Sequence, residues 1–469
     1  MIFRRDNNSY LSNYMLIDES CISMDLDKSF GSWIVETQTQ IKYLDMFSMY
    51  ASQAIGYNHP YMIENLSKLA KASLIKPALP DVFNDIYEQY VEKFVQKTDP
   101  QNNFRYVFFI EGGALAVENA LKVAFDWKAR KNLQKGIFKR NMKVIYFCDA
   151  FHGRSGYTLS ITNMNDPKKT KYFPKHKWCR IKNPKLRFPI TEDILEEVIH
   201  SEEFAIRQIK DAITKYPGEI ASIIIEPIQG EGGDNHFRAE FFKELRKISD
   251  EEDILLIFDE IQTGMGLTGK MWAYEHFGIK PDIISFGKKT QVSGIFVNDR
   301  VDEVTNNVFK QSSRISSTFG GNLTDLVRCG LILDVYEKER LLENTNVQGQ
   351  YFFSKLNMLQ QKYPEFISNV RGKGLFIAFD LPSEAIRNTL VNEAKRQNLI
   401  IGSSGYYSLR LRPHLNVTTE DIDRAINSLD IAVSKIQNQF ARIKICFLPF
   451  KEHTQKKPPI VLSDHGIIN

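Results

Sequence analysis

A carboxylate and a lysine stand at the ends of two successive apolar runs in the middle of the chain. Residues 254–258 are bulky and apolar, and Asp259 closes this run. Residues 283–286 form a second such run, and Lys288 follows it after one glycine. Short apolar runs of this kind predict buried strands of a parallel sheet, and open α/β sheets bind ligands at the carboxyl ends of their strands. We therefore expect Asp259 and Lys288 to share a site.

Pyridoxal phosphate catalysis is the chemistry that needs such a pair. A lysine amine holds this cofactor as a Schiff base, and a carboxylate partners its pyridinium nitrogen, which keeps that nitrogen protonated and lets the ring accept electrons from the substrate. The alternative is that Asp259 and Glu260 begin a turn while Lys288 and Lys289 form a solvated charge pair. These residues alone leave both interpretations open.

Longer motifs around the pair resemble the class III (ω-amino acid) aminotransferases, which are pyridoxal phosphate enzymes of fold type I. The segments FDE and GKK and the glycines between them carry this resemblance. Within the class, the segments GKKTQ, DEIQTGMGLTG and IEGGALAVENALKVAFDWKARKN are most similar to the L-lysine ε-aminotransferases. The resemblance extends from about Gly31 to about Ser434. It implies an enzyme in which Lys288 and Asp259 are catalytic residues.

The cofactor phosphate is expected at a glycine turn between a strand and a helix. EGGA separates the apolar run 104–110 from a helical pattern over 115–132. Small residues there let a phosphate approach backbone N–H groups at the positive end of the helix dipole. A GGA sequence is a weak motif by itself, and Gly112 departs from the form common in class III. Because the L-lysine ε-aminotransferases share this version, Gly113 and Ala114 are the expected phosphate donors.

The resemblance implies three further cofactor contacts. Phe151, in the segment FHGR, would stack on the pyridine ring. Gln262 matches the glutamine beside the phenolic oxygen of the cofactor and is expected to contact substrate as well. Thr318, in SSTFGGN, matches a hydroxyl that reaches the phosphate bound by the neighbouring subunit, so a homodimer with shared sites is expected. The alternative for Phe151 is a core position. Without the resemblance, Thr318 would be interpreted as part of an ordinary turn.

The resemblance also implies two arginines that serve two unlike substrates. Arg154 matches the arginine that clamps the α-carboxylate of lysine or the distal carboxylate of 2-oxoglutarate. Arg410, in LRLRP, would take the α-carboxylate of 2-oxoglutarate, and Glu231, in EPIQGEGG, would neutralise it while lysine is bound. An unpaired buried arginine is costly, so a movable countercharge is expected. Arg412 is the alternative if the register slips by two residues.

Alternating strand and helix patterns predict an α/β fold with a mainly parallel sheet. Strand patterns at 143–148 and 221–226 and a helical pattern at 239–250 join those named above. The resemblance implies fold type I, with a mostly parallel, seven-stranded type of sheet in a large domain and a small α+β domain. The predicted parts are 1–50 (N-terminal part of the small domain), 51–317 (large cofactor domain), 318–440 (C-terminal small domain) and 441–469 (a tail outside the resemblance).

Shorter patterns near both chain ends predict the small domain. A hairpin is expected around residues 36–40, strands are expected at 370–381 and 408–412, and a helix is expected at 419–434. The tail mixes charges and has no clear period, so it is interpreted as an appendix that the apolar segment ICFLPF could order in part.

Composition argues against several other classes of protein. The chain has 469 residues, which is more than one hydrophobic core usually holds. Its 61 basic and 57 acidic residues nearly balance, so nucleic-acid binding is not indicated, and the lysines within 168–177 are interpreted as a solvated loop. Scattered cysteines without a CxxC spacing predict neither a disulfide framework nor a metal site. Without a signal segment or membrane span, a soluble cytoplasmic protein is expected.

The sequence therefore supports the hypothesis of an L-lysine ε-aminotransferase. Lysine and 2-oxoglutarate would give glutamate and 2-aminoadipate 6-semialdehyde, which cyclises to piperideine-6-carboxylate. Lys288 would carry the proton between the ε carbon and the cofactor. Another ω-aminotransferase that uses ornithine, 4-aminobutyrate or a diamine stays open, because the residues do not reveal the donor's chain length. A catalytically silent cofactor-binding or interaction protein is a further alternative, which the presence of both Lys288 and Asp259 disfavours.

Overall fold

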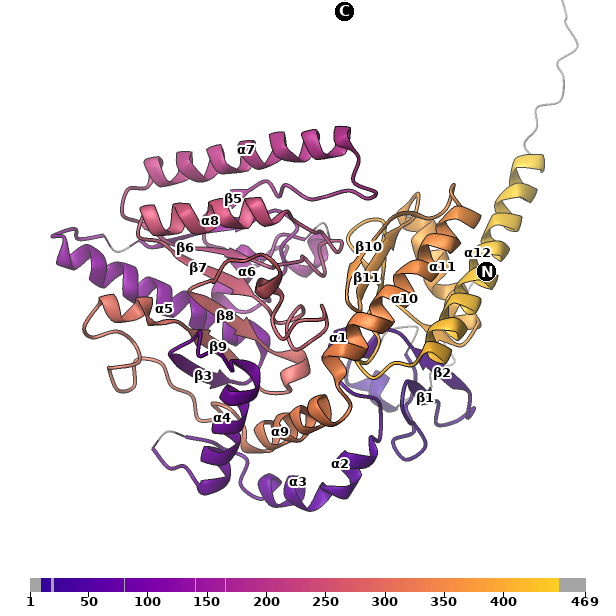
Figure 1. Cartoon of the computed structure of the whole chain (residues 1–469), viewed down its shortest axis with the longest axis horizontal. Coiled ribbons are helices and arrows are strands. Elements are labelled where there is room, and N and C mark those ends of the chain that lie inside the picture. Colours follow the sequence, from indigo (N-terminus) through magenta and orange to yellow (C-terminus); the bar gives the residue numbers. More distant parts are fainter. Residues whose placement is uncertain (1–9, 18–20, 80, 140, 165, 447–469) are drawn as a thin grey trace, which may run out of the picture.

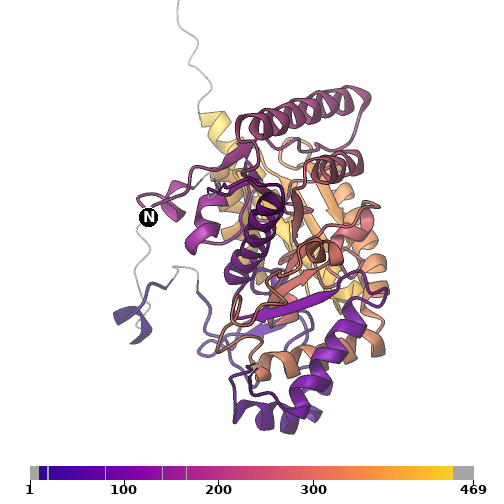
Figure 2. The same cartoon turned by 90° about the vertical axis from the view of Figure 1, so that its left-hand side faces the viewer.

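The computed structural model describes residues 10–17, 21–79, 81–139, 141–164 and 166–446. Figure 1 shows a larger α/β body beside a smaller α+β body. A short 3-10 helix, η1 (Tyr10–Asn13), stands away from both bodies in Figure 2. None of the helices in the described ranges is both long and apolar enough to cross a membrane.

A seven-stranded sheet forms the centre of the larger body. Its strands, in spatial order, are β3 (Tyr106–Ile110), β9 (Ser293–Val297), β8 (Ile283–Phe286), β7 (Leu255–Asp259), β6 (Ile220–Ile225), β4 (Lys143–Phe147) and β5 (Cys179–Ile181). Strands β8, β7, β6, β4 and β5 pair in parallel, whereas β9 pairs antiparallel with both of its neighbours. The predicted mostly parallel α/β sheet is confirmed. The sequence pattern did not predict β9, because Ser293 and Gly294 interrupt its apolar run.

Alternate residues along the strands pack into two separate cores, one on each face of the sheet. On β7, Phe258 lies in the same core as Phe242 of α8 (Ala239–Glu251), while Ile257 lies in the other core with Leu121 of α5 (Gly113–Gln134). Successive side chains of a strand point to opposite faces, so a strand buried on both sides is apolar throughout. Helix α7 (Glu192–Lys215) lies beyond α8 in Figure 1.

The smaller body combines strands from distant parts of the chain. Strands β1 (Trp33–Val35) and β2 (Lys42–Asp45) form the expected hairpin, and β2 also pairs in parallel with β12 (Leu399–Ile400). A second, antiparallel sheet has the order β10 (Ser368–Lys373), β11 (Phe376–Asp380), β14 (Ser408–Leu411) and β13 (Gly402–Ser404). The predicted span 370–381 thus holds two strands, which turn at Gly374 with a positive φ of 57° that suits glycine.

Helices complete both bodies. The smaller body contains α10 (Leu341–Lys362), α11 (Glu384–Arg396) and α12 (Thr419–Cys446), and α9 (Leu323–Lys338) packs against α2 (Pro60–Glu64), α3 (Leu66–Ser73) and α4 (Asp85–Thr98). The remaining short helices that bear on the site are α1 (Ser48–Ala51), α6 (Gly156–Ile161), η2 (Pro167–Lys169), η4 (Lys288–Thr290) and η5 (Asp299–Glu303).

The four predicted parts of the chain stay a prediction. Helix α12 continues past the predicted end at 434 and runs to Cys446. Most of the predicted tail, residues 447–469, lies outside the described residues.

Candidate active site

Asp259 and Lys288 lie at the carboxyl edge of two neighbouring parallel strands. Asp259 ends β7 and is in register with Ser285 of β8, whose hydroxyl donates a hydrogen bond of 3.1 Å to Asp259 Oδ1. The Ile261 N–H donates to the same oxygen at 3.2 Å. Lys288 begins η4, two residues beyond the end of β8. The fold therefore brings the predicted pair to the edge where open α/β sheets bind ligands.

The Lys288 amine is partly buried among charged groups. Burial, and then the positive charge of Arg410, lower the pKa of Lys288 to about 8, although Asp259, Glu226 and Glu231 favour its charged form. Its amine makes no hydrogen bond or ion pair to any described residue, and its backbone has a φ of 53°, which is strained for a residue with a side chain. A lowered pKa increases the fraction of neutral, nucleophilic amine near neutral pH.

The adjacent Lys289 occupies a different environment. Its side chain is 1% exposed, and its amine donates a hydrogen bond of 2.6 Å to the backbone carbonyl of Ala51 in α1. Burial and the nearby charges of Lys288 and Arg412 hold the pKa of Lys289 well below its usual range. Because its amine is bound to the backbone of the N-terminal segment, Lys289 ties that segment to the site, while Lys288 keeps a free amine.

A histidine holds the second oxygen of the Asp259 carboxylate. His152 Nδ1 lies 2.7 Å from Asp259 Oδ2, and both side chains are buried. The backbone N–H of His152 donates a hydrogen bond to Thr162 Oγ1, which fixes the start of the FHGR turn. Contacts to both carboxylate oxygens therefore orient Asp259. The sequence pattern gave no role to His152, although its position between Phe151 and Gly153 in FHGR was a usable signal.

Glu226 joins the FHGR turn to the glycine-rich loop that follows β6. Its two oxygens accept hydrogen bonds of 2.9 Å from the N–H groups of Phe151 and Gly230. Burial raises the pKa of Glu226 to about 7, with His152 opposing and Asp259 adding to the shift. Phe151 is thereby held at the edge of the site with its ring partly buried.

Gln262 packs directly on the same loop. A Cβ at position 230 would lie 2.4 Å from Gln262 Oε1, so a side chain there would displace the Gln262 amide. That oxygen also accepts a hydrogen bond of 3.3 Å from Arg412 Nε. Gln262 therefore lies between the loop and β14, while its predicted contacts with cofactor and substrate stay predictions.

Glu231 and Arg410 form an ion pair beside Lys288. Arg410 Nη2 lies 2.6 Å from Glu231 Oε2, whereas the buried Nε and Nη1 atoms of Arg410 have no hydrogen-bond partner among the described residues. Lys169 Nζ lies 2.6 Å from the other oxygen of the same carboxylate. Burial opposes ionisation of Glu231, but Arg410 and Lys169 outweigh it and lower its pKa. The structure thus brings together two residues that lie far apart in the sequence, as expected.

Arg412 is committed to structural contacts. Its guanidinium pairs with buried Asp234, donates to the Ile377 carbonyl at 3.0 Å and lies over the Phe376 ring. Burial and the neighbouring charges leave its pKa at about 10. Arg410, with two unpartnered nitrogens, is therefore the better candidate for a carboxylate ligand than the alternative register.

The glycine turn at the start of α5 has the form of a phosphate-binding site. Gly112 precedes the helix with a φ of 91°, and Gly113 and Ala114 form its first turn, where N–H groups have no partner within the helix. A Cβ at Gly113 would lie 2.9 Å from Ile261 Cδ1, which places this helix end against the segment that follows Asp259. Anions bind favourably at such an end.

Arg154 and Thr318 have exposed side chains. Arg154 is the last residue of the FHGR turn, just before α6, and no ion pair joins it to another described residue. Thr318 lies between η5 and α9, where Phe319 bridges to Ala78 and Asn322 donates a hydrogen bond of 2.6 Å to Glu111. Glu111 directly precedes Gly112, so the Thr318 segment passes beside the expected phosphate cradle. The functions of both residues stay predictions.

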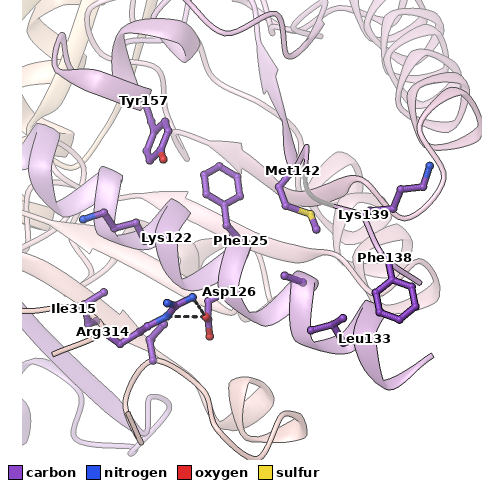
Figure 3. Close-up of a pocket in the computed structure, with 12 residues that line it drawn as sticks. Lys122, Phe125, Asp126, Leu133, Phe138, Lys139, Met142, Tyr157, Arg314 and Ile315 are labelled. Carbon is purple, nitrogen blue, oxygen red and sulfur yellow. Dashed lines mark hydrogen bonds and ion pairs between the residues drawn. The ribbon is translucent and has the colours of Figure 1, made fainter. Parts of the chain in front are cut away.

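These side chains fit pyridoxal phosphate. Lys288 offers an amine, Asp259 an oriented carboxylate, and the first turn of α5 N–H groups without partners in the helix. Among the described residues, His152 Nε2 and the Nε and Nη1 atoms of Arg410 have no hydrogen-bond partner, so they can still bind polar groups. A separate hollow of about 590 Å³ beside the C-terminal half of α5 contains none of the predicted site residues. Figure 3 shows that Arg314 and Asp126, both in the lining of this hollow, form an ion pair.

The known proteins that are similar to this chain include aminotransferases. The Aminotransferase class-III family model matches residues 15–433. The chain is 45% identical over 428 residues to an L-lysine-epsilon aminotransferase of Mycobacterium tuberculosis, covering 90% of this chain and 94% of the relative. It is 41% identical over 437 residues to an enzyme of the same name from Streptomyces clavuligerus, covering 92% and 95%. A solved lysine aminotransferase from M. tuberculosis in the internal aldimine form superposes with a TM-score of 0.88 at 45% identity, covering 91% of this chain and 98% of that chain.

Proposed function

Because the chain belongs to the class III aminotransferase family, we propose that it is an L-lysine ε-aminotransferase that transfers the terminal amino group of lysine to 2-oxoglutarate. The relatives at 41% and 45% identity support the choice of lysine as donor. The ion pair between Glu231 and Arg410 beside Lys288 carries the proposal for two substrates. In this proposal, Glu231 neutralises the Arg410 guanidinium while lysine is bound, and the guanidinium pairs with the α-carboxylate when 2-oxoglutarate is bound.

Pyridoxal phosphate would be the cofactor of this reaction. The Lys288 amine would hold it, Asp259 would face its ring nitrogen, and the N–H groups of Gly113 and Ala114 would bind its phosphate. Phe151 would stack on the ring. When bound, the cofactor supplies an electron sink for the charge that develops on the substrate carbon.

The chain's own groups would then bind the substrates and move the proton. Arg154 would bind the α-carboxylate of lysine, which leaves the ε-amine at the reacting centre while Glu231 keeps Arg410 neutralised. The Lys288 amine would remove the proton from the ε carbon, and a pKa of about 8 suits a base that works near neutral pH. With 2-oxoglutarate, the α-carboxylate would replace Glu231 on Arg410, and Arg154 would take the distal carboxylate.

A homodimer with shared sites belongs to this proposal. The exposed Thr318 segment beside the start of α5 supports it, because a hydroxyl on that surface can reach a second copy of the chain. The cytoplasmic location expected from the sequence also stays a proposal.

Substitution of Thr318 by alanine is expected to weaken cofactor binding and to leave the choice of amino donor unchanged. A lost hydrogen bond to a charged phosphate costs about 1.5–3 kcal/mol, which corresponds to roughly a 10- to 150-fold higher dissociation constant. Fluorescence titration of the apoenzyme with pyridoxal phosphate measures this change. Ser317→Ala, on the same segment, is the matched control. A monomer with full activity in solution would contradict the shared site.

A donor panel tests the proposed function directly. Holoenzyme is incubated with 2-oxoglutarate and with lysine, ornithine, 4-aminobutyrate or a diamine, and the glutamate that forms is quantified. Lysine should be the preferred donor, and its product should be trapped as the cyclic imine. Preference for ornithine or 4-aminobutyrate would replace the proposed substrate, and a protein that transfers no amino group from any donor would refute the proposed function.

A further inference from the structure

One lysine of the basic segment 168–177 turns toward the site instead of the solvent. Lys169 ends the short helix η2, and its Nζ lies 2.6 Å from Glu231 Oε1. Arg410 Nη2 lies 2.6 Å from Glu231 Oε2. The two oxygens of one carboxylate thus have separate cationic partners, one from each side. The sequence pattern, which predicts a solvated loop for this segment, gave no role to Lys169.

Lys169, Glu231 and Arg410 form a triad whose exposure to solvent differs from one end to the other. The side chains of Lys169, Glu231 and Arg410 are 29%, 19% and 2% exposed, so the triad leads from the protein surface to the buried site. The turn that carries Lys169 is well defined, because Asp166 accepts a hydrogen bond from the Lys168 N–H and the Lys171 N–H donates to the Pro167 carbonyl. Lys169 can therefore hold Glu231 from outside while its own ammonium stays partly hydrated.

We propose that Lys169 is a positioning residue for 2-oxoglutarate and glutamate. It holds the Glu231 carboxylate in place when the α-carboxylate of either substrate binds Arg410 instead. This proposal rests on the proposed function, in which Arg410 changes partner. Without Lys169, breaking the pair would leave a largely buried carboxylate with no countercharge, which is costly. Lys169 also competes with Arg410 for Glu231, so it weakens the contact that the substrate must break. Both effects favour the carboxylate substrate and leave the lysine complex, in which the pair stays closed, largely unaffected.

Half-reactions of the holoenzyme, followed separately by stopped-flow spectroscopy, test this inference. Lys169→Met should raise the half-saturating concentrations of 2-oxoglutarate and glutamate by roughly 5- to 10-fold, in the range of couplings between contacting charges. The half-saturating concentration of lysine should change by less than about twofold. Lys169→Arg should restore the unaltered values. Lys168→Met removes a neighbouring exposed charge and serves as the matched control, with no expected change.

A second background separates positioning from simple attraction of anions. In a Glu231→Gln enzyme, Lys169→Met should no longer affect 2-oxoglutarate, because the group through which Lys169 acts has lost its charge. An undiminished effect would mean that Lys169 attracts the dicarboxylate directly, and equal losses in both half-reactions would mean a structural role. Either result overturns this inference while the proposed function stands. If the unaltered enzyme fails to react with lysine or 2-oxoglutarate, the proposed function and this inference both fail.

Discussion

Replacement of Lys288 by alanine is expected to lower turnover by about 10⁵-fold or more, which is the scale of loss when a covalent catalyst is removed. The cofactor should still bind through the start of α5 and Asp259, but it should no longer attach covalently. Reduction of the holoenzyme with borohydride, followed by peptide mapping, should place the label on Lys288. A label on Lys289 would reverse the assignment.

Lys289→Met is the matched control for this experiment. The Lys289 amine is bound to the Ala51 carbonyl, so its removal should affect the packing of the N-terminal segment and leave covalent attachment of the cofactor intact.

The rate at which the cofactor attaches to the apoenzyme should also report the pKa of Lys288. Since burial lowers that pKa to about 8, the rate should rise about tenfold per pH unit below 8 and level off above it. A rise that continues to pH 10 would indicate an ordinary lysine.

The parts of the fold that the sequence predicted are those in which local pattern and burial agree. Strands β7 and β8 are mostly apolar because both of their faces are buried, and helix α8 has a clear amphipathic pattern. Their bounds were therefore predicted to within about a residue. Strand β9 was missed, because its Ser293 and Gly294 are atypical of strands and become buried only through antiparallel pairing with β3 and β8.

The same distinction holds for the site. Asp259 and Lys288 could be paired from sequence, because Asp259 ends one recognisable strand, Lys288 lies just beyond the end of another, and the two strands follow one another in the chain. Contacts that depend on tertiary packing could not be found this way. Lys169 reaches Glu231 from 62 residues away, and His152 reaches Asp259 across 107 residues. The two lysines of GKK were equivalent by type, and only the burial and hydrogen bonding of Lys289 separate their roles.

Glu231→Gln is expected to change substrate preference more than overall activity. In the unaltered protein, Glu231 neutralises Arg410, whose Nε and Nη1 atoms have no other partner. Once Glu231 is neutral, Arg410 stays uncompensated while lysine presents its ε-amine, so the lysine half-reaction should slow. Glutamate brings an α-carboxylate that pairs with Arg410, so its half-reaction should be preserved or faster. The difference between the two effects should be about 1–3 kcal/mol, or roughly 5- to 150-fold.

Separate stopped-flow measurement of the two half-reactions decides between this explanation and a structural one. Glu202→Gln is the matched control, because Glu202 is also a largely buried glutamate with an arginine partner: its Oε2 lies 3.6 Å from Arg238 Nη1. Glu202 belongs to α7, outside the site. It should leave the ratio of the two half-reactions unchanged. If Glu231→Gln slows lysine and glutamate equally, Glu231 supports only the local structure. If only the lysine half-reaction slows, the Glu231 carboxylate is the movable countercharge that allows one site to accept two substrates of opposite end-group charge.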